Sequence, residues 1–346
     1  MSASEFSKRL IAWQKTAGRQ GLPWQNTSDP YRVWLSEIML QQTQVATVIP
    51  YYQRFLERFP TLADLAAAPV EEVMPLWAGL GYYARARNLH KCAQAVVAQH
   101  GGEFPRDAAL IAELPGIGRS TANAIASFCF GTQTPILDGN VKRVFARCFG
   151  IEGFPGTRAV EQEMWALAET LMPARNTGTY TQAQMDLGAT VCTRGKPLCA
   201  RCPLADMCVA YRDGRTQELP VARPKKAVPE RESFFLLMRS PQGILLEQRP
   251  PSGIWGSLLC LPELPVGSDA ASYAREHYGV VAQQWHEQTA LRHTFTHFHL
   301  TLRPLLADVT LLPQAAESNV RWLNASEFEA AALPTPIRTL LAMSHG

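Results

Sequence analysis

The segment LPGIGRSTANAIASF (114–128) places a short turn with two glycines between the end of one predicted helix and the start of another. Gly116 and Gly118 have no Cβ atom, so an anion can closely approach the backbone N–H groups of this turn. The second helix begins near Arg119–Ser120, and its positive end points to the same place. The segment therefore predicts a helical hairpin that binds phosphate and reads no base. An ordinary turn is the alternative, since a G-x-G pattern alone is weak evidence.

The sequence around this hairpin predicts further helices. Throughout residues 4–190, apolar residues recur at helical spacing, as at Phe6 and Leu10. The Asp-Pro pair at 29–30, and Thr61 before LADLAAA, are typical helix starts. Strand-like alternation is rare in this part of the chain, so we expect an all-helical array.

The composition changes after residue 212. Residues 213–231 are predicted to be a linker, because they contain three prolines and the pair Lys225-Lys226. Residues 232–346 have the patterns of a small α+β domain. We expect strands at 233–239, 243–249 and 291–306, and helices at 269–278 and 326–332.

The overall composition indicates a folded, soluble protein. A length of 346 residues suits about two domains, and 47% hydrophobic with 18% charged residues argues against disorder. The net charge of +3 arises within residues 1–220, which hold 22 Lys and Arg against 19 Asp and Glu. This excess is too small to identify a nucleic-acid-binding protein without motifs. No secretory signal or membrane-spanning stretch is visible, so we expect a reducing compartment.

Four of the eight cysteines are clustered. Cys192, Cys199, Cys202 and Cys208 are separated by six, two and five residues. A zinc ribbon usually has two C-x-x-C pairs, and this stretch has one. Iron–sulfur clusters take four cysteines, so the spacing strongly favours metal binding and favours iron–sulfur over zinc only weakly. The other four cysteines are expected to be small buried apolar residues.

These features together resemble the helix-hairpin-helix DNA glycosylase superfamily and, within it, the MutY family of adenine DNA glycosylases. The resemblance covers nearly the full length of the chain. The matching segments are LPWQ (22–25), WLSEIMLQQTQV (34–45), GLGYYARARNLH (79–90), LPGIGRS (114–120), ILDGNVKRV (136–144), MDLGA (185–189), the four cysteines, RPPSGIWG (249–256) and RHTFTHFHL (292–300).

The resemblance implies a multidomain α and α+β fold. A helical catalytic region would occupy residues 1–212, with a six-helix barrel and its hairpin at about 30–135. A second helical domain, built from residues 1–29 and 136–212, would carry a [4Fe–4S] cluster on the four cysteines. Residues 232–346 would form a Nudix-like domain after the linker.

Glu37 is the candidate general acid. An N-glycosidic bond is broken when an acid protonates the leaving base while a carboxylate faces the oxocarbenium-like sugar. Glu37 lies in the apolar stretch VWLSEIML, and desolvation there raises its pKa and keeps it protonated near neutrality. It would protonate N7 of an adenine extruded from the duplex and later act as a base toward water. A buried Glu paired with an Arg fits the residues equally well, and the resemblance favours catalysis.

Asp138 is the candidate second carboxylate, at a predicted helix N-terminus in ILDGNVKRV. An N-cap is a common use of Asp there, while backbone N–H donors also keep a carboxylate ionised beside a developing cation. The resemblance implies a transient covalent bond from Asp138 to the sugar, with Asn140 holding water or the sugar. Ser120 occupies the position at which related glycosylase–lyases carry a Schiff-base lysine, so we predict a monofunctional glycosylase. Some relatives have Tyr at this position.

The resemblance also suggests residues that contact DNA. Gln42 and Tyr82 resemble wedge residues that fill the gap beside the base opposite the extruded adenine, although core packing is the commoner use of such a tyrosine. Weaker candidates for the adenine pocket are Arg19, Gln20, Trp24 and Gln182. Three cations between the cysteines suit phosphate contact, or are ordinary solvated charges: Arg194, Lys196 and Arg201.

In the second domain, Phe295, Thr296 and His297 occupy the place of a Phe-Ser-His loop that recognises 8-oxoguanine in similar proteins. Thr in place of Ser keeps the hydroxyl and adds a methyl group. His293, His297 and His299 alternate along a predicted strand. We favour a half-exposed strand over a zinc site, because no acidic or Cys ligand adjoins them.

The second domain lacks the residues of a working Nudix hydrolase. Arg275 and Glu276 are followed by His277 and Tyr278, where the glutamates that hold magnesium would stand. We therefore expect a domain that recognises DNA damage and does not hydrolyse diphosphates.

The sequence predicts hydrolysis of adenine from double-stranded DNA, opposite 8-oxoguanine or, more weakly, guanine. We expect a monomer that is cytoplasmic and associated with the nucleoid through DNA. One alternative is a glycosylase–lyase of the endonuclease III type acting on oxidised pyrimidines, which Ser120 and the extra domain argue against. Another is a non-catalytic DNA-binding or redox-sensing iron–sulfur protein, which leaves Glu37 and Asp138 unexplained.

Overall fold

The computed structural model describes residues 3–224, 227–251, 253–313 and 319–343. Lys225 and Lys226 of the predicted linker, and Ser252 of RPPSGIWG, lie outside these ranges. The chain forms two compact units: the first contains Met1–Ala67 and Asn88–Lys225, and the second contains Ala68–Arg87 and Lys226–Gly346.

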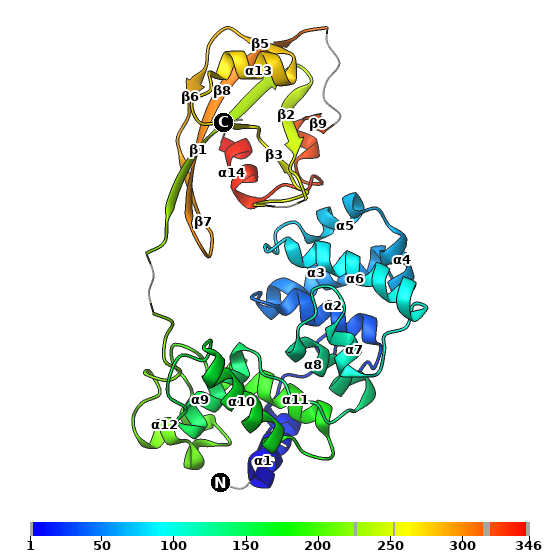
Figure 1. Ribbon diagram of the computed structural model, residues 1–346, viewed down its shortest axis with the longest axis vertical. Helices are drawn as coiled ribbons and strands as arrows, with labels where there is room; N and C mark the ends of the chain where they lie inside the picture. Colours follow the sequence, from blue (N-terminus) through cyan, green and yellow to red (C-terminus); the bar gives the residue numbers. More distant parts are fainter. Residues whose placement is uncertain (1–2, 225–226, 252, 314–318, 344–346) are drawn as a thin grey trace. The chain divides into compact units, whose positions relative to one another are not determined.

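The first unit is helical, as the sequence predicts (Figure 1). Its helices are α1 (Ala3–Ala17), α2 (Pro30–Leu40), α3 (Val45–Arg58), α4 (Leu62–Ala67), α6 (Ala84–His100, continuing from the second unit), α7 (Ala108–Ala112), α8 (Arg119–Phe130), α9 (Gly139–Phe149), α10 (Arg158–Leu171), α11 (Thr177–Asp186) and α12 (Val209–Arg212). A π-helical turn at Leu187–Val191 continues α11, and 3₁₀ turns lie at Cys199–Arg201 and Ala205–Met207.

Local capping explains where several of these helices begin. Asp29 accepts a hydrogen bond from the Tyr31 N–H at 2.9 Å, and Pro30 occupies the first position of α2, where its missing N–H costs nothing. Thr61 Oγ1 accepts from the Asp64 N–H while Asp64 accepts from Thr61, so the two residues cap α4 reciprocally. These contacts confirm both starts that the sequence indicates.

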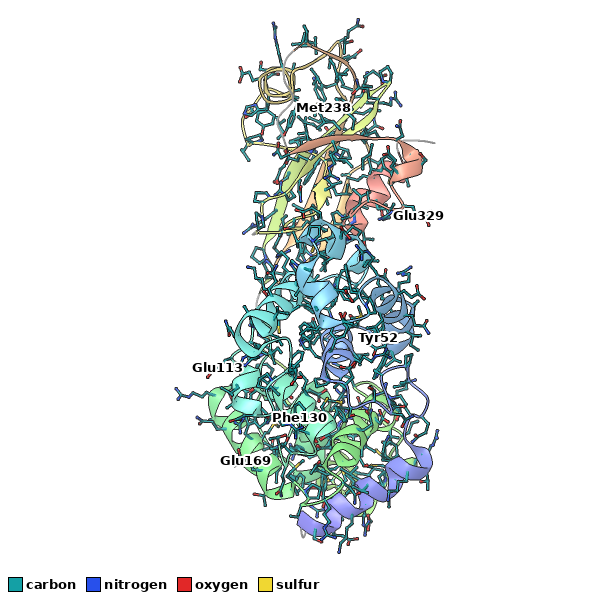
Figure 2. All side chains as sticks on the ribbon, turned by 90° about the vertical axis from the view of Figure 1, so that its right-hand side faces the viewer. Tyr52, Glu113, Phe130, Glu169, Met238 and Glu329 are labelled. Carbon is teal, nitrogen blue, oxygen red and sulfur yellow. The ribbon has the colours of Figure 1, made fainter. Side chains whose placement is uncertain are left out.

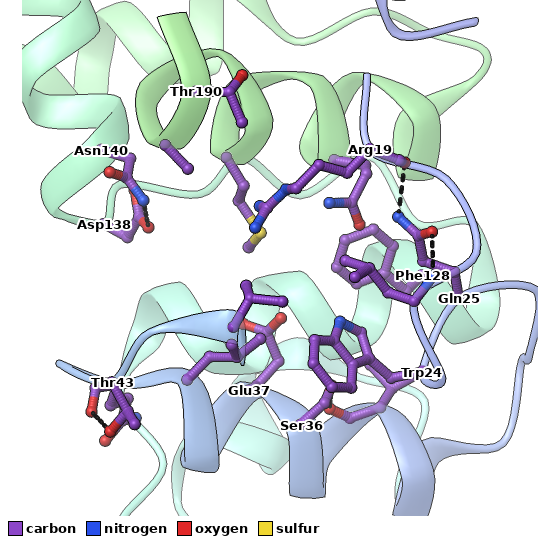
Figure 3. A pocket seen from close by; sticks show the side chains of 18 of the residues that line it. Arg19, Trp24, Gln25, Ser36, Glu37, Thr43, Phe128, Asp138, Asn140 and Thr190 are labelled. Carbon is purple, nitrogen blue, oxygen red and sulfur yellow. Dashed lines mark hydrogen bonds between the residues drawn. The ribbon is translucent and has the colours of Figure 1, made fainter. Parts of the chain in front are cut away.

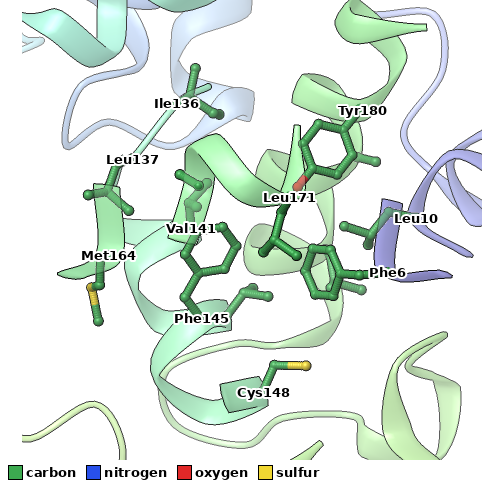
Figure 4. Close-up of a cluster of buried hydrophobic side chains, with 14 of the residues drawn as sticks. Phe6, Leu10, Ile136, Leu137, Val141, Phe145, Cys148, Met164, Leu171 and Tyr180 are labelled. Atoms are coloured by element: carbon green, nitrogen blue, oxygen red, sulfur yellow. The ribbon is translucent and has the colours of Figure 1, made fainter. Parts of the chain in front are cut away.

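A shared hydrophobic core joins the N-terminal helix to the later helices. Phe6 and Leu10 of α1 pack with Val141 and Phe145 of α9 and with Tyr180 of α11 (Figure 4). The rings of Phe6 and Phe145 meet edge to face with centroids 6.1 Å apart, a favourable arrangement for two aromatic quadrupoles. Segments from both ends of the helical chain therefore depend on one core.

The second unit contains a mixed β-sheet with helices. Its strands are β1 (Glu230–Ser240), β2 (Gly243–Gln248), β3 (Leu259–Cys260), β4 (Glu263–Leu264), β5 (Val280–Ala282), β6 (His286–Glu287), β7 (Leu291–Thr294), β8 (His299–Leu311) and β9 (Val320–Leu323). The path through the sheet is β3-β2-β1-β8-β5, and among the described strands β1 and β8 are the one pair that runs parallel. The helices are α5 (Val70–Trp77), α13 (Ala270–Tyr278) and α14 (Thr335–Met343).

The structure corrects three details of the predicted second part. Strand β1 begins at Glu230, inside the segment predicted as linker. The run 291–306 is a hairpin of β7 and β8 and not one strand. The helix predicted at 326–332 is wrong, because only a 3₁₀ turn forms at Ala325–Glu327, while the unpredicted α14 begins nearby with Pro336 in its first turn, where proline is tolerated.

Charged and apolar side chains separate between surface and interior in each unit. Tyr52 and Met238 are buried, whereas Glu113, Glu169 and Glu329 are exposed (Figure 2). Among the residues that the structure describes, no helix combines the length and the apolar character needed to cross a membrane.

Candidate active site

A cavity of about 1600 Å³ opens in the first unit, between α2, α8, α11 and the segment after α1. Figure 3 shows Glu37 and Trp24 on one side of this cavity and Asp138 and Asn140 on another, all turned toward the space between them. It brings together nine predicted residues: Arg19, Gln20, Trp24, Glu37, Gln42, Ser120, Asp138, Asn140 and Gln182. The predicted DNA and catalytic residues of the helical region therefore largely share one space.

Glu37 lies on α2 between apolar neighbours that face the core. Burial raises the pKa of its carboxyl to about 8, and the negative charge of Asp138 adds to this shift. No ion pair joins Glu37 to an arginine within the described ranges. The geometry therefore does not support the alternative of a buried Glu–Arg pair. The carboxyl is protonated at neutral pH and can donate a proton into the cavity.

Asp138 is the N-cap of α9 and also faces the cavity. Its Oδ1 accepts from the Val141 N–H at 2.8 Å, and its Oδ2 accepts from Asn140 Nδ2 at 3.4 Å. Burial raises the pKa of Asp138, against the opposing effect of these donors and of Arg143. Desolvation has the larger effect on this pKa, while the backbone N–H and Asn140 donors favour the ionised carboxylate.

Arg143 of α9 connects the Asp138 region to the cysteine loop. Its Nη2 donates to Asn140 Oδ1 and to the Gly188 carbonyl, both at 2.7 Å, and its Nε donates to the Cys192 carbonyl at 2.7 Å. Gly188 is required at this crossing, because an added Cβ would lie 2.4 Å from the Asn140 Cβ. Asn140 is thus held by the same side chain that holds the first cysteine.

Ser120 stands in the first turn of α8 and faces the cavity. Its Oγ accepts a hydrogen bond from the Leu137 N–H at 3.0 Å. Ser120 therefore holds the segment that leads directly into Asp138. A hydroxyl cannot form a Schiff base with a sugar.

The hairpin predicted at 114–128 is formed by α7, a turn and α8. Gly116 has φ +76°, and an added Cβ would lie 2.6 Å from the Asn88 Cβ, so only glycine fits there without strain. Gly118 differs, since it has an extended backbone and open space around the position of a Cβ. The N-terminus of α8 has no side-chain cap, which suits an anion at its first N–H groups.

Asp186 is a fully buried carboxylate that organises one wall of the cavity. Its Oδ1 accepts from Arg19 Nε at 2.7 Å and from Gln182 Nε2 at 2.9 Å, and its Oδ2 accepts from Gln14 Nε2 at 2.9 Å. Arg19 and Gln182 therefore each commit a donor to Asp186. Trp24 completes this wall, with its ring centroid 5.4 Å from that of Tyr52.

The two predicted wedge residues have unusual backbones. Gln42 is exposed with φ +57° at the edge of the cavity. Tyr82 belongs to the second unit, has φ +48°, and leaves 49% of its surface exposed. Tyr82 is therefore not a core aromatic, and its strained, exposed position is the kind found at ligand contacts.

The four clustered cysteines stand at the ends of short elements. Cys192 follows the π-helical turn, Cys199 begins a 3₁₀ turn that Cys202 ends, and Cys208 precedes α12. Arg147, which is buried, donates to Cys192 Sγ at 3.4 Å and to the Thr193 and Arg194 carbonyls. The loop is thus held on α9 by a buried cation.

Four thiols on one loop are the donor set that an iron–sulfur cluster takes. Burial, with a smaller contribution from the neighbouring thiols, raises the pKa of Cys199 and brings that of Cys202 to about 12. In the described part of the chain, no group of three His, Cys, Asp or Glu is close enough to hold one metal ion.

In the second unit, Phe295, Thr296, His297 and Phe298 form a hairpin tip between β7 and β8. The Phe295 N–H donates to the Phe298 carbonyl at 2.9 Å and closes the turn. Thr296 and His297 are exposed, while Phe298 is buried. The side chains predicted to read a base therefore project from a closed turn.

On α13, aromatic contacts occupy the positions after Arg275 and Glu276. His277 stacks on Tyr273 with ring centroids 4.0 Å apart. The Tyr278 hydroxyl donates to Glu247 Oε2 at 2.7 Å.

Three family models match the chain. The model described as HhH-GPD superfamily base excision DNA repair protein matches residues 35–170. A NUDIX domain model matches residues 233–343, and the iron-sulfur binding domain of endonuclease III matches residues 192–208. The domain order agrees with the resemblance that the sequence motifs indicate.

Similarity to named proteins extends over almost the whole chain. An adenine DNA glycosylase of Buchnera aphidicola subsp. Acyrthosiphon pisum is 36% identical over 338 residues, covering 97% of this chain and 96% of the relative. The adenine DNA glycosylase of Homo sapiens is 35% identical, covering 99% of this chain and 74% of the relative. The chain belongs to the adenine DNA glycosylase family.

Solved structures agree with this assignment. The structure of a thermostable thymine-DNA glycosylase aligns with a TM-score of 0.56 and 30% identity, covering 61% of this chain and 97% of that chain. A non-covalent endonuclease III–DNA complex aligns with a TM-score of 0.52 and 25% identity, covering 62% and 98%.

Membership of the adenine DNA glycosylase family fixes the enzyme class. The chain is a hydrolase of N-glycosyl bonds in base excision repair, its substrate is DNA, and its cofactor is a [4Fe–4S] cluster. The residues that would hold the cluster are Cys192, Cys199, Cys202 and Cys208. There the cluster would tie one loop into a fixed shape beside α9.

Sequence reasoning missed several residues of this adenine DNA glycosylase fold. Asp186, Arg143 and Arg147 each bind a residue that is far away in the sequence: Arg19, Cys192 and Thr193, respectively. The matching segments MDLGA and ILDGNVKRV contain Asp186 and Arg143 and were the signals available. Three apolar side chains of the cavity were also missed: Leu40, Phe128 and Met185.

Proposed function

We propose that the chain is a monofunctional glycosylase that hydrolyses the N-glycosidic bond of adenine opposite 8-oxoguanine, and more weakly opposite guanine, and leaves an abasic site. It acts on double-stranded DNA as a monomer. The observation that carries this proposal is one cavity faced by Glu37 and Asp138, in which burial, with a smaller contribution from the charge of Asp138, raises the pKa of Glu37. Two carboxyls with different protonation states are what acid-assisted glycosidic cleavage requires.

Glu37 supplies the proton in the first step. Its protonated carboxyl donates to N7 of the extruded adenine, and the C1′–N9 bond breaks with its electron pair going to the base. Burial keeps this proton on Glu37 at neutral pH. The resulting carboxylate then removes a proton from the water that attacks C1′.

Asp138 stabilises the sugar while the base leaves. Its carboxylate faces the positive charge that develops at C1′, and that charge is strongest in the transition state. Through the hydrogen bond to Asn140, and from there to Arg143, the carboxylate keeps a fixed orientation. Asp138 also forms the transient covalent bond to C1′ that water later replaces.

The reaction ends at the abasic site because the hairpin presents the Ser120 hydroxyl, and not an amine, to the cavity. Ser120 faces the cavity from α8, and its hydroxyl is already bonded to the Leu137 N–H. A lyase needs an amine that forms a Schiff base with the sugar. This supports the monofunctional assignment over the endonuclease III type.

Recognition of the mispair uses residues other than Glu37 and Asp138. The uncapped start of α8 binds a phosphate, Gln42 and Tyr82 fill the gap beside the base opposite the extruded adenine, and Phe295, Thr296 and His297 contact 8-oxoguanine. The Thr296 hydroxyl replaces the serine hydroxyl that similar proteins carry there. Gln42, Tyr82, Thr296 and His297 are exposed, and Gly118 faces open space, as contacts to DNA require.

The test is single-turnover excision of adenine from a duplex with one A:8-oxoguanine pair. Glu37→Gln keeps the shape of the side chain and removes the acid, so the rate is expected to fall by about 10²–10⁴-fold. Glu113→Gln, an exposed glutamate near the hairpin, is the matched control and should leave the rate unchanged. Undiminished excision by Glu37→Gln would overturn the assignment.

A trapping experiment tests the monofunctional assignment separately. Borohydride reduces a Schiff base to a stable covalent adduct. We expect no efficient adduct with the wild-type chain, and strand cleavage only after added alkali. An efficient adduct would instead favour a glycosylase–lyase.

A further inference from the structure

A strained turn in the second unit packs against the hairpin tip. We call residues 253–258 the Trp255 turn. Trp255 and Ser257 have φ of +54° and +64°, a region that bulky L-residues rarely adopt because it is energetically unfavourable for them. Such backbone strain persists only where surrounding contacts fix it.

Hydrogen bonds and close packing hold this turn closed. The Arg249 N–H donates to the Leu258 carbonyl at 2.9 Å, and the Ser257 N–H donates back to the Arg249 and Pro250 carbonyls. Gly256 allows the closure, since an added Cβ would lie 2.7 Å from the Pro251 carbonyl oxygen. These hydrogen bonds and contacts therefore hold the turn in one closed conformation.

The same turn is fixed from outside by Arg87, at the start of α6. Arg87 Nη1 donates to the Gly256 carbonyl at 2.8 Å, directly beside Trp255. Arg87 is partly buried, and this burial lowers the pKa of its guanidinium.

Trp255 directs its ring to the base of the hairpin tip. Its side chain is 6% exposed, and its ring centroid lies 5.6 Å from that of Phe295 and 6.1 Å from that of His293. Phe295 in turn stacks on Phe298 at 4.6 Å. An aromatic column therefore runs from the strained turn into the closed turn that presents Thr296 and His297.

We propose that Trp255 is a positioning residue for base recognition: it fixes the ring of Phe295 and thereby the hairpin tip in the conformation that contacts 8-oxoguanine. This inference rests on the proposed function of residues 295–297. Trp255 does not touch DNA in this scheme. The contacts of the Trp255 ring with Phe295 and His293 hold the indole beside the hairpin tip.

A second tryptophan provides a matched control. Trp285 packs against a buried cluster that includes Leu236 and Met238 of β1, and Phe234 packs against the same cluster. Trp255 packs on Phe235, at 6.3 Å. Because neighbouring strand residues point to opposite faces, Trp255 and Trp285 lie on opposite faces of the sheet, and only Trp255 reaches the hairpin tip.

The experiment compares Trp255→Leu with Trp285→Leu in the full-length protein. Dissociation constants and single-turnover excision rates are measured for duplexes with adenine opposite 8-oxoguanine and opposite guanine. We expect Trp255→Leu to lower the preference for 8-oxoguanine roughly tenfold, as expected for lost aromatic contacts, and Trp285→Leu to lower thermal stability without changing this preference. Trp255→Phe, which keeps an aromatic ring, should restore most of the preference.

Phe295→Leu separates this inference from the function on which it rests. If Phe295→Leu reduces the preference and Trp255→Leu does not, Trp255 is not a positioning residue, although the hairpin tip still recognises the base. If Phe295→Leu has no effect, the proposed reading function itself fails. An equal loss of preference in Trp255→Leu and Trp285→Leu would also overturn the inference, because the effect would then reflect general destabilisation.

Discussion

Glu37 and Asp138 lie beneath the surface of the helical unit, whereas Thr296 and His297 stand exposed at a hairpin tip of the sheet unit. In the helical unit, burial changes the pKa of the side chains that would do the chemistry. In the sheet unit, packed aromatic rings support the exposed side chains, and titration plays no part in their proposed role. The first site thus depends on desolvation and the second on shape, so the two should respond differently to pH and to side-chain truncation.

The largest expected effect is on the pH dependence of excision. Glu37 must be protonated to act as an acid, and its pKa is raised to about 8 by burial. The single-turnover rate should therefore be level below about pH 8 and fall tenfold per pH unit above it. At low pH the rate should fall as Asp138 becomes protonated, at a pH above the usual range because burial also raises its pKa.

Recognition of 8-oxoguanine should differ in this respect. The preference for 8-oxoguanine over guanine should not follow the pH dependence of the excision rate. Rates are measured with both mispairs across the pH range. A rate that stays level well above pH 8 would contradict the assignment of Glu37 as the acid.

The next effect concerns the free energy of unfolding, which should differ between substitutions at Gly116 and at Gly118. Gly116→Ala places a Cβ against Asn88 in a left-handed backbone, so unfolding in denaturant should show a loss of about 1–3 kcal/mol. Gly118→Ala meets open space in an extended backbone, and its stability should stay within about 0.5 kcal/mol of wild type. Gly118→Ala should instead weaken DNA binding, because its methyl group would stand where a phosphate approaches. Equal stability of the two variants would refute this division.

The smallest effect is expected at Thr296. Thr296→Val keeps the branched shape and removes the hydroxyl, so the preference for 8-oxoguanine should fall roughly three- to tenfold, as for one lost hydrogen bond. Thr296→Ser keeps the hydroxyl and serves as the control. The ratio of dissociation constants for the two mispairs measures the effect, and an unchanged ratio in Thr296→Val would assign recognition to another group.

The local sequence was sufficient where a residue acts through its own neighbours. The apolar run around Glu37 predicts its raised pKa, and the glycine turn predicts the hairpin of α7 and α8. At Asp138 the sequence predicts the helix cap and its donors but misses the depth of burial, which depends on elements far away in the chain. Capping patterns are local, while desolvation is a property of the whole fold.

Long-range partners and backbone strain were beyond sequence reasoning. Asp186 and Arg147 act on residues that no short motif connects to them. The strained φ of Trp255 follows from closure of its turn, and bulky residues carry no preference for such a backbone. At α14 the local sequence is misleading. Pro334 and Pro336 suggest a break, yet the helix begins at Thr335, because proline suits the first turn of a helix.

The buried carboxylate of Asp186 has a consequence for how the enzyme is made. Arg19 precedes it by 167 residues, so a ribosome that has just released Arg19 has still to synthesise the group that neutralises it. Domains fold in order as a chain emerges, and this wall of the cavity cannot close until both Arg19 and Asp186 have left the exit tunnel. A chain that ends before Asp186 therefore contains the Arg19 cation but lacks the carboxylate that pairs with it.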